Sequence, residues 1–294
     1  MATRSLSFRT AFTDIACILL LSLVLLLLLY VFDEPVHRGF FCDDESIRYP
    51  VPKYQTVSDV TVGVVAVGVP IIVVVIMEIV QSGFVHPTSL VLFGWTPHLW
   101  MVQCYAHIGV FLFGGGMQLL TVEAAKRLVG RLRPHFLAAC LPVALDCTAA
   151  GHKYITSYTC SGNPDLIKDA RLSFPSGHSS LSFYAATFII MYLQIRMTWE
   201  GSKLLKHLLQ FLAVMAAWAT ALSRVSDYMH HWSDVLSGIV IGTLFGILTI
   251  LFMSNLHWKK ELSDDHMELI SLLQRTNFPY STTESSSRVL SAPC

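Results

Sequence analysis

Residues 15–32 read IACILLLSLVLLLLLYVF, an apolar run that contains no charged side chain. Five further apolar runs follow along the chain, at 60–80, 100–121, 176–195, 204–222 and 232–253. A helix of about 20 such residues crosses the hydrocarbon core of a bilayer. Backbone in lipid must satisfy its own hydrogen bonds, and these runs are continuous rather than alternating, so the sequence predicts helices and not a β-barrel. We expect an all-α integral membrane protein with six transmembrane helices.

The overall composition indicates the same class of protein. Of the 294 residues, 53% are hydrophobic and 14% are charged, whereas soluble domains carry about 25% charged residues. A soluble globule could not bury this much apolar surface, and a disordered chain would not contain it. The 20 basic and 20 acidic residues balance, so the chain lacks the excess positive charge that binding to nucleic acid requires. We therefore expect a bilayer, and no nucleic acid, as a partner.

The first apolar run is predicted to be a retained anchor rather than a cleaved signal peptide. It is longer than a signal-peptide core of about 7–15 residues, and residues 32–34 (Phe-Asp-Glu) form a poor cleavage site. We divide the chain into an N-terminal segment at 1–11, a six-helix domain at 12–255 and a tail at 256–294, whose Ser/Thr-rich end predicts disorder. Basic residues are distributed almost evenly over the two sides of the spans, so the positive-inside rule gives no orientation.

Polar clusters stand at those span ends that share one side of the membrane. Because consecutive spans alternate in direction, the end of the third span, the start of the fourth and the turn between the fifth and sixth lie on one face in either orientation. The first cluster, KRLVGRLRP at 126–134, contains Lys126 and Arg133. On a helix these two share a face, about 10 Å apart along the axis. Two long cations directed at one point suit a phosphate group, although snorkelling toward lipid headgroups explains the same residues.

The second cluster, SFPSGH at 173–178, opens the fourth predicted span. Pro at a first helical position with Gly beside it makes an accessible helix N-terminus, whose free N–H groups and positive dipole end favour an anion. Ser176 adds a hydroxyl group next to Gly177, and His178 can donate a proton near neutral pH. The structural alternative is an ordinary helix start with an interfacial histidine.

The third cluster, SRVSDYMHHWSD at 223–234, contains His230 and Asp234, which face each other if the segment is helical. A carboxylate on one imidazole nitrogen would leave the other nitrogen as a nucleophile, and Arg224 adds a third cation. A zinc site with His230, His231 and Asp234 as ligands fits the usual ligand spacings poorly. The three clusters together supply the cations, the nucleophile and the acid that phosphoryl transfer needs. Because no acidic cluster for Mg²⁺ or Ca²⁺ accompanies them, we expect neither a metal nor another cofactor.

These clusters resemble the three signature motifs of the type 2 phosphatidate phosphatase (PAP2) superfamily, in order and with the expected spacing: Lys126-x6-Arg133-Pro134, Pro175-Ser176-Gly177-His178 and Ser223-Arg224-x5-His230-x3-Asp234. The segments at 38–50, 130–134 and 224–234 are further similar to the animal lipid phosphate phosphatases. The resemblance covers about residues 12–255. One departure is Pro175, where animal members often carry Tyr.

The resemblance implies a role for each motif residue. His230 would attack phosphorus and form a phosphohistidine, Asp234 would orient His230, and His178 would protonate the leaving alkoxide. The phosphate oxygens would be held by Lys126, Arg133, Ser176, Gly177 and Arg224. The family further implies Mg²⁺-independent hydrolysis of phosphatidate, lysophosphatidate, ceramide-1-phosphate and sphingosine-1-phosphate. Its active site lies at helix ends on the extracellular or lumenal face, with both termini cytosolic and the plasma membrane as the expected location.

Other functions stay open at this point. A polyprenyl diphosphate phosphatase would hold phosphate in the same way. A catalytically silent membrane protein that binds lipid phosphates or partner proteins is disfavoured, because every motif position is filled. A transporter is disfavoured because no charged residue sits in the middle of a span. The sequence does not decide whether the chain forms a homo-oligomer.

The implied orientation would place Cys42, Cys140, Cys147 and Cys160 in an oxidising compartment. The sequence does not determine their pairing, and we favour Cys147–Cys160, which would hold the long loop after the third span. Within that span, His107 is interpreted as a packing residue rather than a site residue.

Overall fold

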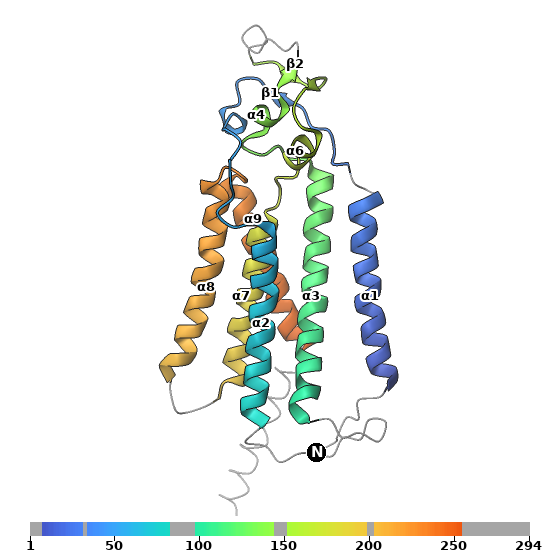
Figure 1. Cartoon of the computed structure of the whole chain (residues 1–294), viewed down its shortest axis with the longest axis vertical. Helices are drawn as coiled ribbons and strands as arrows, with labels where there is room; N and C mark the ends of the chain where they lie inside the picture. Colours follow the sequence, from blue (N-terminus) through green and yellow to red (C-terminus); the bar gives the residue numbers. More distant parts are fainter. Residues whose placement is uncertain (1–7, 32–33, 83–97, 144–151, 199–202, 255–294) are drawn as a thin grey trace, which may run out of the picture. The chain divides into compact units, whose positions relative to one another are not determined.

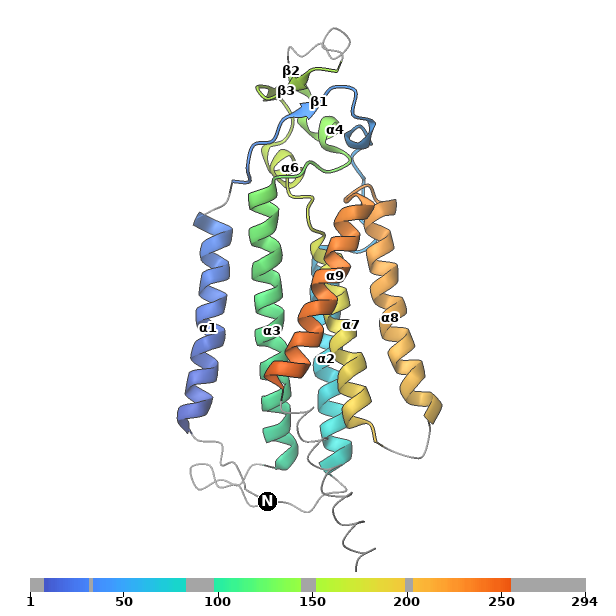
Figure 2. The ribbon, with the colours of Figure 1, turned by 180° about the vertical axis from the view of Figure 1, so that it is seen from behind.

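The computed structural model describes residues 8–31, 34–82, 98–143, 152–198 and 203–254. All of them belong to one compact unit, Met1–Leu256. The predicted tail at 256–294 and most of the predicted N-terminal segment at 1–11 lie outside the described residues. Long helices run side by side beneath a smaller cap of short elements (Figures 1 and 2). The long helices are α1 (Phe8–Val31), α2 (Asp59–Ser82), α3 (Leu99–Val129), α7 (Gly177–Arg196), α8 (Lys203–Ser226) and α9 (Trp232–Leu248), which continues as the π-helical η2 (Thr249–Met253).

The chain is a mostly helical integral membrane protein. In the part of the chain that the structure describes, five helical segments are long and apolar enough to cross a bilayer: Ala11–Val31, Asp59–Ser82, Leu99–Val129, Leu204–Ser226 and Trp232–Met253. The fourth predicted span, at 176–195, forms helix α7. It is not among these five because it carries many polar side chains and begins with the residues Gly-His-Ser-Ser. Helix α7 packs against α9, α8, α2 and α3, so its polar side chains are covered by neighbouring helices.

Close packing between α7 and α9 depends on glycines spaced four residues apart on α9. A Cβ atom at Gly238 would lie 2.5 Å from the Ser176 carbonyl oxygen, and one at Gly242 would collide with the Ser180 carbonyl oxygen. A stripe of small residues lets two helix backbones approach closely in a membrane. Figure 2 shows α9 lying across α7 as a result, which brings the start of α9 to the start of α7.

Helix α3 ends earlier than the sequence pattern predicts. Gly130 is its C-cap in the left-handed conformation, with φ 57°, and a Cβ atom there would collide with the Val36 carbonyl oxygen. The helix therefore stops at Val129, and Arg133 lies beyond it in the connection to the cap. The prediction that Lys126 and Arg133 share a helix face is wrong, because the left-handed glycine ends the helix between them.

The cap is built from the segments that connect α1 to α2 and α3 to α7. Strand β1 (Phe40–Phe41) pairs antiparallel with β3 (Tyr154–Ile155), and β2 (Pro142–Val143) pairs antiparallel with β4 (Thr159–Cys160). Short helices η1 (Glu45–Ile47), α4 (Phe136–Cys140) and α6 (Pro164–Asp169) complete it. Its buried core consists of Phe40, Cys42, Ile47, Leu132, Phe136, Ala139, Cys140 and Ala170.

A disulfide bond in the cap joins Cys140 to Cys160. The predicted pair Cys147–Cys160 is therefore wrong, and Cys147 itself lies outside the described residues. Pairing of β2 with β4 places Pro142 opposite Cys160, which brings the Cys140 and Cys160 Cα atoms within 4.7 Å of each other. The bond ties the end of α4 to β4, within the connection that carries two of the three motif clusters.

A buried polar cluster lies in the helical bundle far from the cap. Glu78 on α2 accepts hydrogen bonds from the Tyr192 hydroxyl at 2.6 Å and from Arg196 Nε at 2.9 Å, and His107 Nε2 is 3.5 Å from its carboxylate. Glu78 is 19 residues from Asp59 at the other end of α2, a separation of about 28 Å along a helix. His107 therefore joins helices far from the motif residues, which confirms its interpretation as a packing residue.

Candidate active site

The three sequence clusters meet where the cap rests on the ends of the helices. Of the eight predicted site residues, six are buried, while Lys126 and Gly177 are half-buried. The Ser176 backbone N–H donates to the Asp234 carbonyl oxygen at 3.0 Å, which joins the second cluster to the third. A Cβ atom at Gly177 would lie 3.1 Å from Lys126 Nζ, so the first cluster also reaches the start of α7. Residues from α3, α7 and the α8–α9 turn thus form one site.

The start of α7 is shaped by Ser176, its N-cap residue. The Ser176 hydroxyl oxygen accepts a hydrogen bond from the Ser179 hydroxyl at 3.0 Å, and the backbone N–H of Ser179 lies 3.4 Å from it. Pro175 precedes this cap, so the prediction that it occupies the first helical position is wrong by two residues. Gly177 occupies that position instead, and its missing side chain leaves the space into which Lys126 extends.

His178 lies one residue into α7 between a carbonyl group and a cation. Its Nε2 atom is 3.2 Å from the Val57 carbonyl oxygen and 3.4 Å from Arg224 Nη1. Its Nδ1 atom lies 3.7 Å from a carboxylate oxygen of the exposed Asp59. A ring with polar partners on both nitrogens is held in orientation, and it can give or receive a proton at the point where Arg224 would hold an anion.

His230 is 4% exposed, and its Nδ1 atom is 2.7 Å from the Ser173 carbonyl oxygen. A carbonyl oxygen only accepts hydrogen bonds, so Nδ1 carries the proton and the lone pair of the neutral ring lies on Nε2. Burial lowers the pKa of His230 well below its usual value, and the charges of Arg133 and Lys126 lower it further. The ring is therefore kept neutral, with a free basic nitrogen among cations.

The expected contact between Asp234 and the His230 ring is replaced by an indirect one. Asp234 Oδ2 accepts hydrogen bonds from the Ser173 hydroxyl at 2.6 Å and from the His231 backbone N–H at 3.1 Å, and Oδ1 pairs with Arg131. The i, i+4 rule fails here because α9 begins only at Trp232, so His230 precedes the helix. Asp234 is completely buried and holds Ser173, and the Ser173 carbonyl group holds His230.

Each of the predicted phosphate-holding cations contacts a carboxylate. Lys126 Nζ is 2.7 Å from Glu123, Arg133 Nη2 is 2.7 Å from Asp169, and Arg224 Nη2 is 3.0 Å from Asp227. The buried Arg133 Nε atom has no hydrogen-bond partner among the residues that the structure describes. The cations that are predicted to hold phosphate are therefore already placed against anionic groups in this structure.

These residues lie in a region with known relatives. The model of the PAP2 superfamily matches residues 107–258, which include all eight predicted site residues. The chain belongs to the PAP2 superfamily. It is 37% identical over 259 residues to phospholipid phosphatase 1 of Rattus norvegicus, covering 87% of this chain and 88% of that protein. It is 37% identical over 242 residues to phospholipid phosphatase 2 of Mus musculus, covering 82% and 85%.

A further PAP2-type relative comes from Drosophila melanogaster and is named "Putative phosphatidate phosphatase". It is 44% identical over 250 residues, which cover 80% of this chain and 66% of that protein. The match thus spans slightly less than two thirds of that relative's own length. No solved structure matches the chain.

The PAP2 site does not resemble the zinc site considered from the sequence. His230 Nδ1 is directed at the Ser173 carbonyl oxygen, while His231 Nδ1 lies 3.2 Å from Asp234 Oδ2. The three proposed ligands therefore do not converge on one point. Within the described ranges, no group of three or more His, Cys, Asp or Glu side chains is placed to hold a metal ion.

Sequence reasoning missed several partners in the PAP2 site. The segment before α2 reaches the site through Gln55, whose side-chain oxygen accepts from Arg224 at 3.0 Å, and through Thr56, which donates twice to Asp227. Ser173 lies in the second cluster, where nothing in its residue type indicates its contacts with Asp234 and His230. Spacing could have suggested Asp227, which lies three residues after Arg224 on a helix. Nothing in the local sequence around Gln55 indicates its position, because that contact joins residues 169 apart.

Proposed function

We propose that the chain is a Mg²⁺-independent lipid phosphate phosphatase that acts through a phosphohistidine at His230. Membership in the PAP2 superfamily and relatives named as phospholipid phosphatases support a phosphatase hydrolase. The observation that carries the mechanism is the position of His230, whose Nδ1 atom is held by the Ser173 carbonyl group. Burial and the charges of Arg133 and Lys126 lower its pKa, which favours the neutral ring. That arrangement fits a nucleophile which attacks an anionic phosphorus centre.

The reaction would proceed in two displacement steps. His230 Nε2 forms a bond to phosphorus while the bond from phosphorus to the lipid oxygen breaks, and His178 gives its proton to the leaving alkoxide. A water molecule then attacks the phosphohistidine and transfers a proton to His178, which releases inorganic phosphate and restores His230. Lys126, Arg133 and Arg224 would stabilise the charge on the transferred group together with the Ser176 hydroxyl and the Gly177 backbone N–H. Metal ions have this role in many other phosphoryl-transfer sites.

The position of the site supports lipid substrates. It lies at helix ends, where the phosphate of a lipid is within reach while its chains stay in the bilayer. The resemblance to the animal lipid phosphate phosphatases implies the substrates phosphatidate, lysophosphatidate, ceramide-1-phosphate and sphingosine-1-phosphate, and we propose these for the chain. A polyprenyl diphosphate is the second candidate, since the same cations would hold its phosphate groups.

The proposed topology has six membrane-spanning helices within residues 12–255. They are the five apolar helices and the more polar α7, which lies between them. Both termini are then cytosolic and the site is extracellular or lumenal, in the plasma membrane. The disulfide between Cys140 and Cys160 supports this orientation, because it lies in the cap next to the site and such bonds persist in oxidising compartments.

Phosphate release from lysophosphatidate by the full-length protein in detergent, with EDTA present, tests the proposal. We expect release to continue in EDTA at the rate measured without it, because the cations of the chain perform the role of a metal. A loss of activity in EDTA that added Mg²⁺ or Zn²⁺ restores would overturn the metal independence. A folded protein that releases phosphate from no lipid phosphate would be the silent binding protein instead.

The lowered pKa of His230 predicts an unusual pH dependence. Activity requires the neutral ring, and it is lost as the pH falls through the pKa of the free enzyme. Because burial and two cations lower that pKa, we expect the acid limb of kcat/KM below pH 6.5, the usual value for histidine. The second ionisation of the substrate phosphate also contributes to the pH profile of kcat/KM. Its pKa is therefore measured separately by ³¹P NMR, so that the remaining acid limb can be assigned to the enzyme. If the acid limb that belongs to the enzyme has a pKa at or above 6.5, the result would contradict a neutral, buried His230 as the nucleophile.

A further inference from the structure

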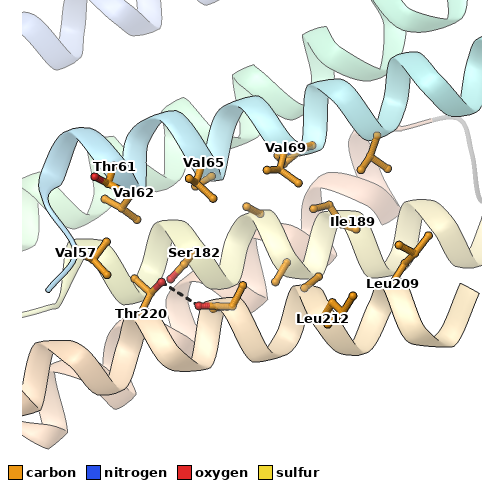
Figure 3. A pocket seen from close by; sticks show the side chains of 18 of the residues that line it. Val57, Thr61, Val62, Val65, Val69, Ser182, Ile189, Leu209, Leu212 and Thr220 are labelled. Carbon is orange, nitrogen blue, oxygen red and sulfur yellow. Dashed lines mark hydrogen bonds between the residues drawn. The ribbon is translucent and has the colours of Figure 1, made fainter. Parts of the chain in front are cut away.

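An apolar groove runs along the helices between α2, α7 and α8 (Figure 3). Helices α2 and α8 both pack on α7, which forms the floor of the groove between them. The space exists because small side chains face it, among them Ala185 and Ala186 on α7 and Ala213, Ala216 and Ala217 on α8. Its volume is about 390 Å³, which lies within the range of about 300–1,000 Å³ that is typical of ligand pockets.

One end of the groove adjoins the candidate active site. Val57 lines this end, and its carbonyl oxygen is 3.2 Å from His178 Nε2. Ser182 lines it one helical turn after His178 and donates to the His178 carbonyl oxygen at 2.6 Å. Thr220 lines the opposite wall, one turn before Arg224 on α8. The groove therefore begins directly beside two of the residues that are proposed to act on the phosphate group.

The groove continues away from the site along the helix axes. It follows α7 from Ser182 to Leu193 and α2 from Thr61 to Val73, which corresponds to about 16–18 Å at the rise of an α-helix. Some of the side chains in its walls are exposed, including Val65 at 50% and Leu212 at 53%, so the groove is open toward the surrounding lipid. A cationic end joined to a long apolar channel is complementary to an amphiphile with an anionic head.

We propose that this groove binds one hydrocarbon chain of the lipid phosphate while the phosphate lies at the motif residues. The proposal rests on the proposed function and names the part of the substrate that α2, α7 and α8 recognise. The side chains of the groove would then contact the methylene groups of that chain in place of the surrounding lipid tails. The length of the chain that the groove accepts then determines which lipid phosphates are hydrolysed fastest at equal surface concentration.

A larger side chain that fills part of the groove tests whether a hydrocarbon chain of the substrate binds there. Ala216 lines it, and its exposed position on α8 leaves room for a larger side chain without disturbing the buried core. Ala219→Phe is the matched control, because Ala219 lies exposed on the same helix and does not line the groove. The substrates are lysophosphatidates from hexanoyl to stearoyl in mixed micelles at a fixed mole fraction, together with water-soluble glycerol 3-phosphate.

We expect kcat/KM of the wild type to rise with chain length. In Ala216→Phe the values for long chains should fall by about tenfold or more, because the ring takes the place of part of the acyl chain and misplaces the phosphate group. The values for hexanoyl lysophosphatidate and glycerol 3-phosphate should stay unchanged. Ala219→Phe should match the wild type. An Ala216→Phe protein that hydrolyses the whole series with the wild-type chain-length profile would overturn the assignment.

A photolabelling experiment tests whether the acyl chain binds in the groove, independently of phosphate release. Lysophosphatidate with a diazirine in its acyl chain is expected to label residues 61–73, 182–193 and 209–220 of the wild type, and this labelling should be lost in Ala216→Phe. Labelling without phosphate release from any substrate would overturn the proposed function and leave the groove assignment standing. Equal labelling by a diazirine phosphatidylcholine, which lacks the terminal phosphate, would show that bulk lipid fills the groove and would overturn the assignment.

Discussion

Replacing His230 with alanine is expected to lower kcat for lysophosphatidate by about 10⁴-fold, the usual cost of removing a catalytic nucleophile. His230 combines burial, a tautomer fixed by the Ser173 carbonyl group, and the nearby charges of Arg133 and Lys126. The cations that hold the phosphate group remain in the variant. The apparent affinity for lysophosphatidate should therefore change by less than about tenfold, since binding and chemistry depend on different groups.

Formation of the phosphohistidine can be measured directly in the wild type and in His230→Ala. Single-turnover mixing with ³²P-labelled lysophosphatidate, followed by a base quench, should yield labelled wild-type protein whose label is lost in acid, as expected of a phosphohistidine. His230→Ala should yield none. His207→Ala is the matched control, because His207 lies on α8 with an exposed partner, Gln210, outside the site. Label that persists in His230→Ala would assign the nucleophile to another residue.

Replacing Asp234 with asparagine is expected to have the second largest effect, a loss in kcat of about 10²- to 10⁴-fold. The Asp234 carboxylate accepts from the Ser173 hydroxyl, from the His231 backbone and from Arg131, and all of these are donors. The amide group of asparagine would turn a donor toward at least one of them. The Ser173 carbonyl group would then lose its position, and with it the orientation of His230.

Two comparisons distinguish positioning from a general loss of stability. Ser173→Ala removes the hydroxyl contact and keeps the carbonyl group, so its kcat should fall less than that of Asp234→Asn. If Asp234 positions His230, Asp234→Asn should lower kcat per folded molecule, with KM nearly unchanged, and should shift the acid limb of the pH profile. A variant whose activity falls only in proportion to its folded fraction would show that Asp234 merely stabilises the start of α9.

Local patterns predicted much of this protein because they depend on short-range physics. An apolar run of about 20 residues specifies a membrane helix wherever it occurs, and five of the expected spans meet that criterion. The alternation of spans predicted that Lys126, His178 and His230 lie on one face. The structure brings the three motif clusters together at one end of the helices, although α7 is too polar to count as a span by composition alone.

The contacts that orient the site were not predictable, because they join segments far apart in the sequence. His230 is held by a carbonyl group 57 residues away, and Arg224 contacts a side chain 169 residues away. The Cys140–Cys160 pairing likewise depends on the register of two short strands in the cap. A backbone carbonyl has the same chemistry in every residue, so no residue type in the sequence marks Ser173 as the partner of a histidine.

The sequence by itself determined the class of protein and predicted that the three motif clusters meet, because hydropathy, helix length and alternation are properties of consecutive residues. Only the tertiary structure decided which groups hold His230, where α3 ends relative to Arg133, and that a groove for one hydrocarbon chain adjoins the site. These features arise when helices from distant parts of the chain pack together. Small residues on α7 and α8 become a cavity only when α2 lies beside them.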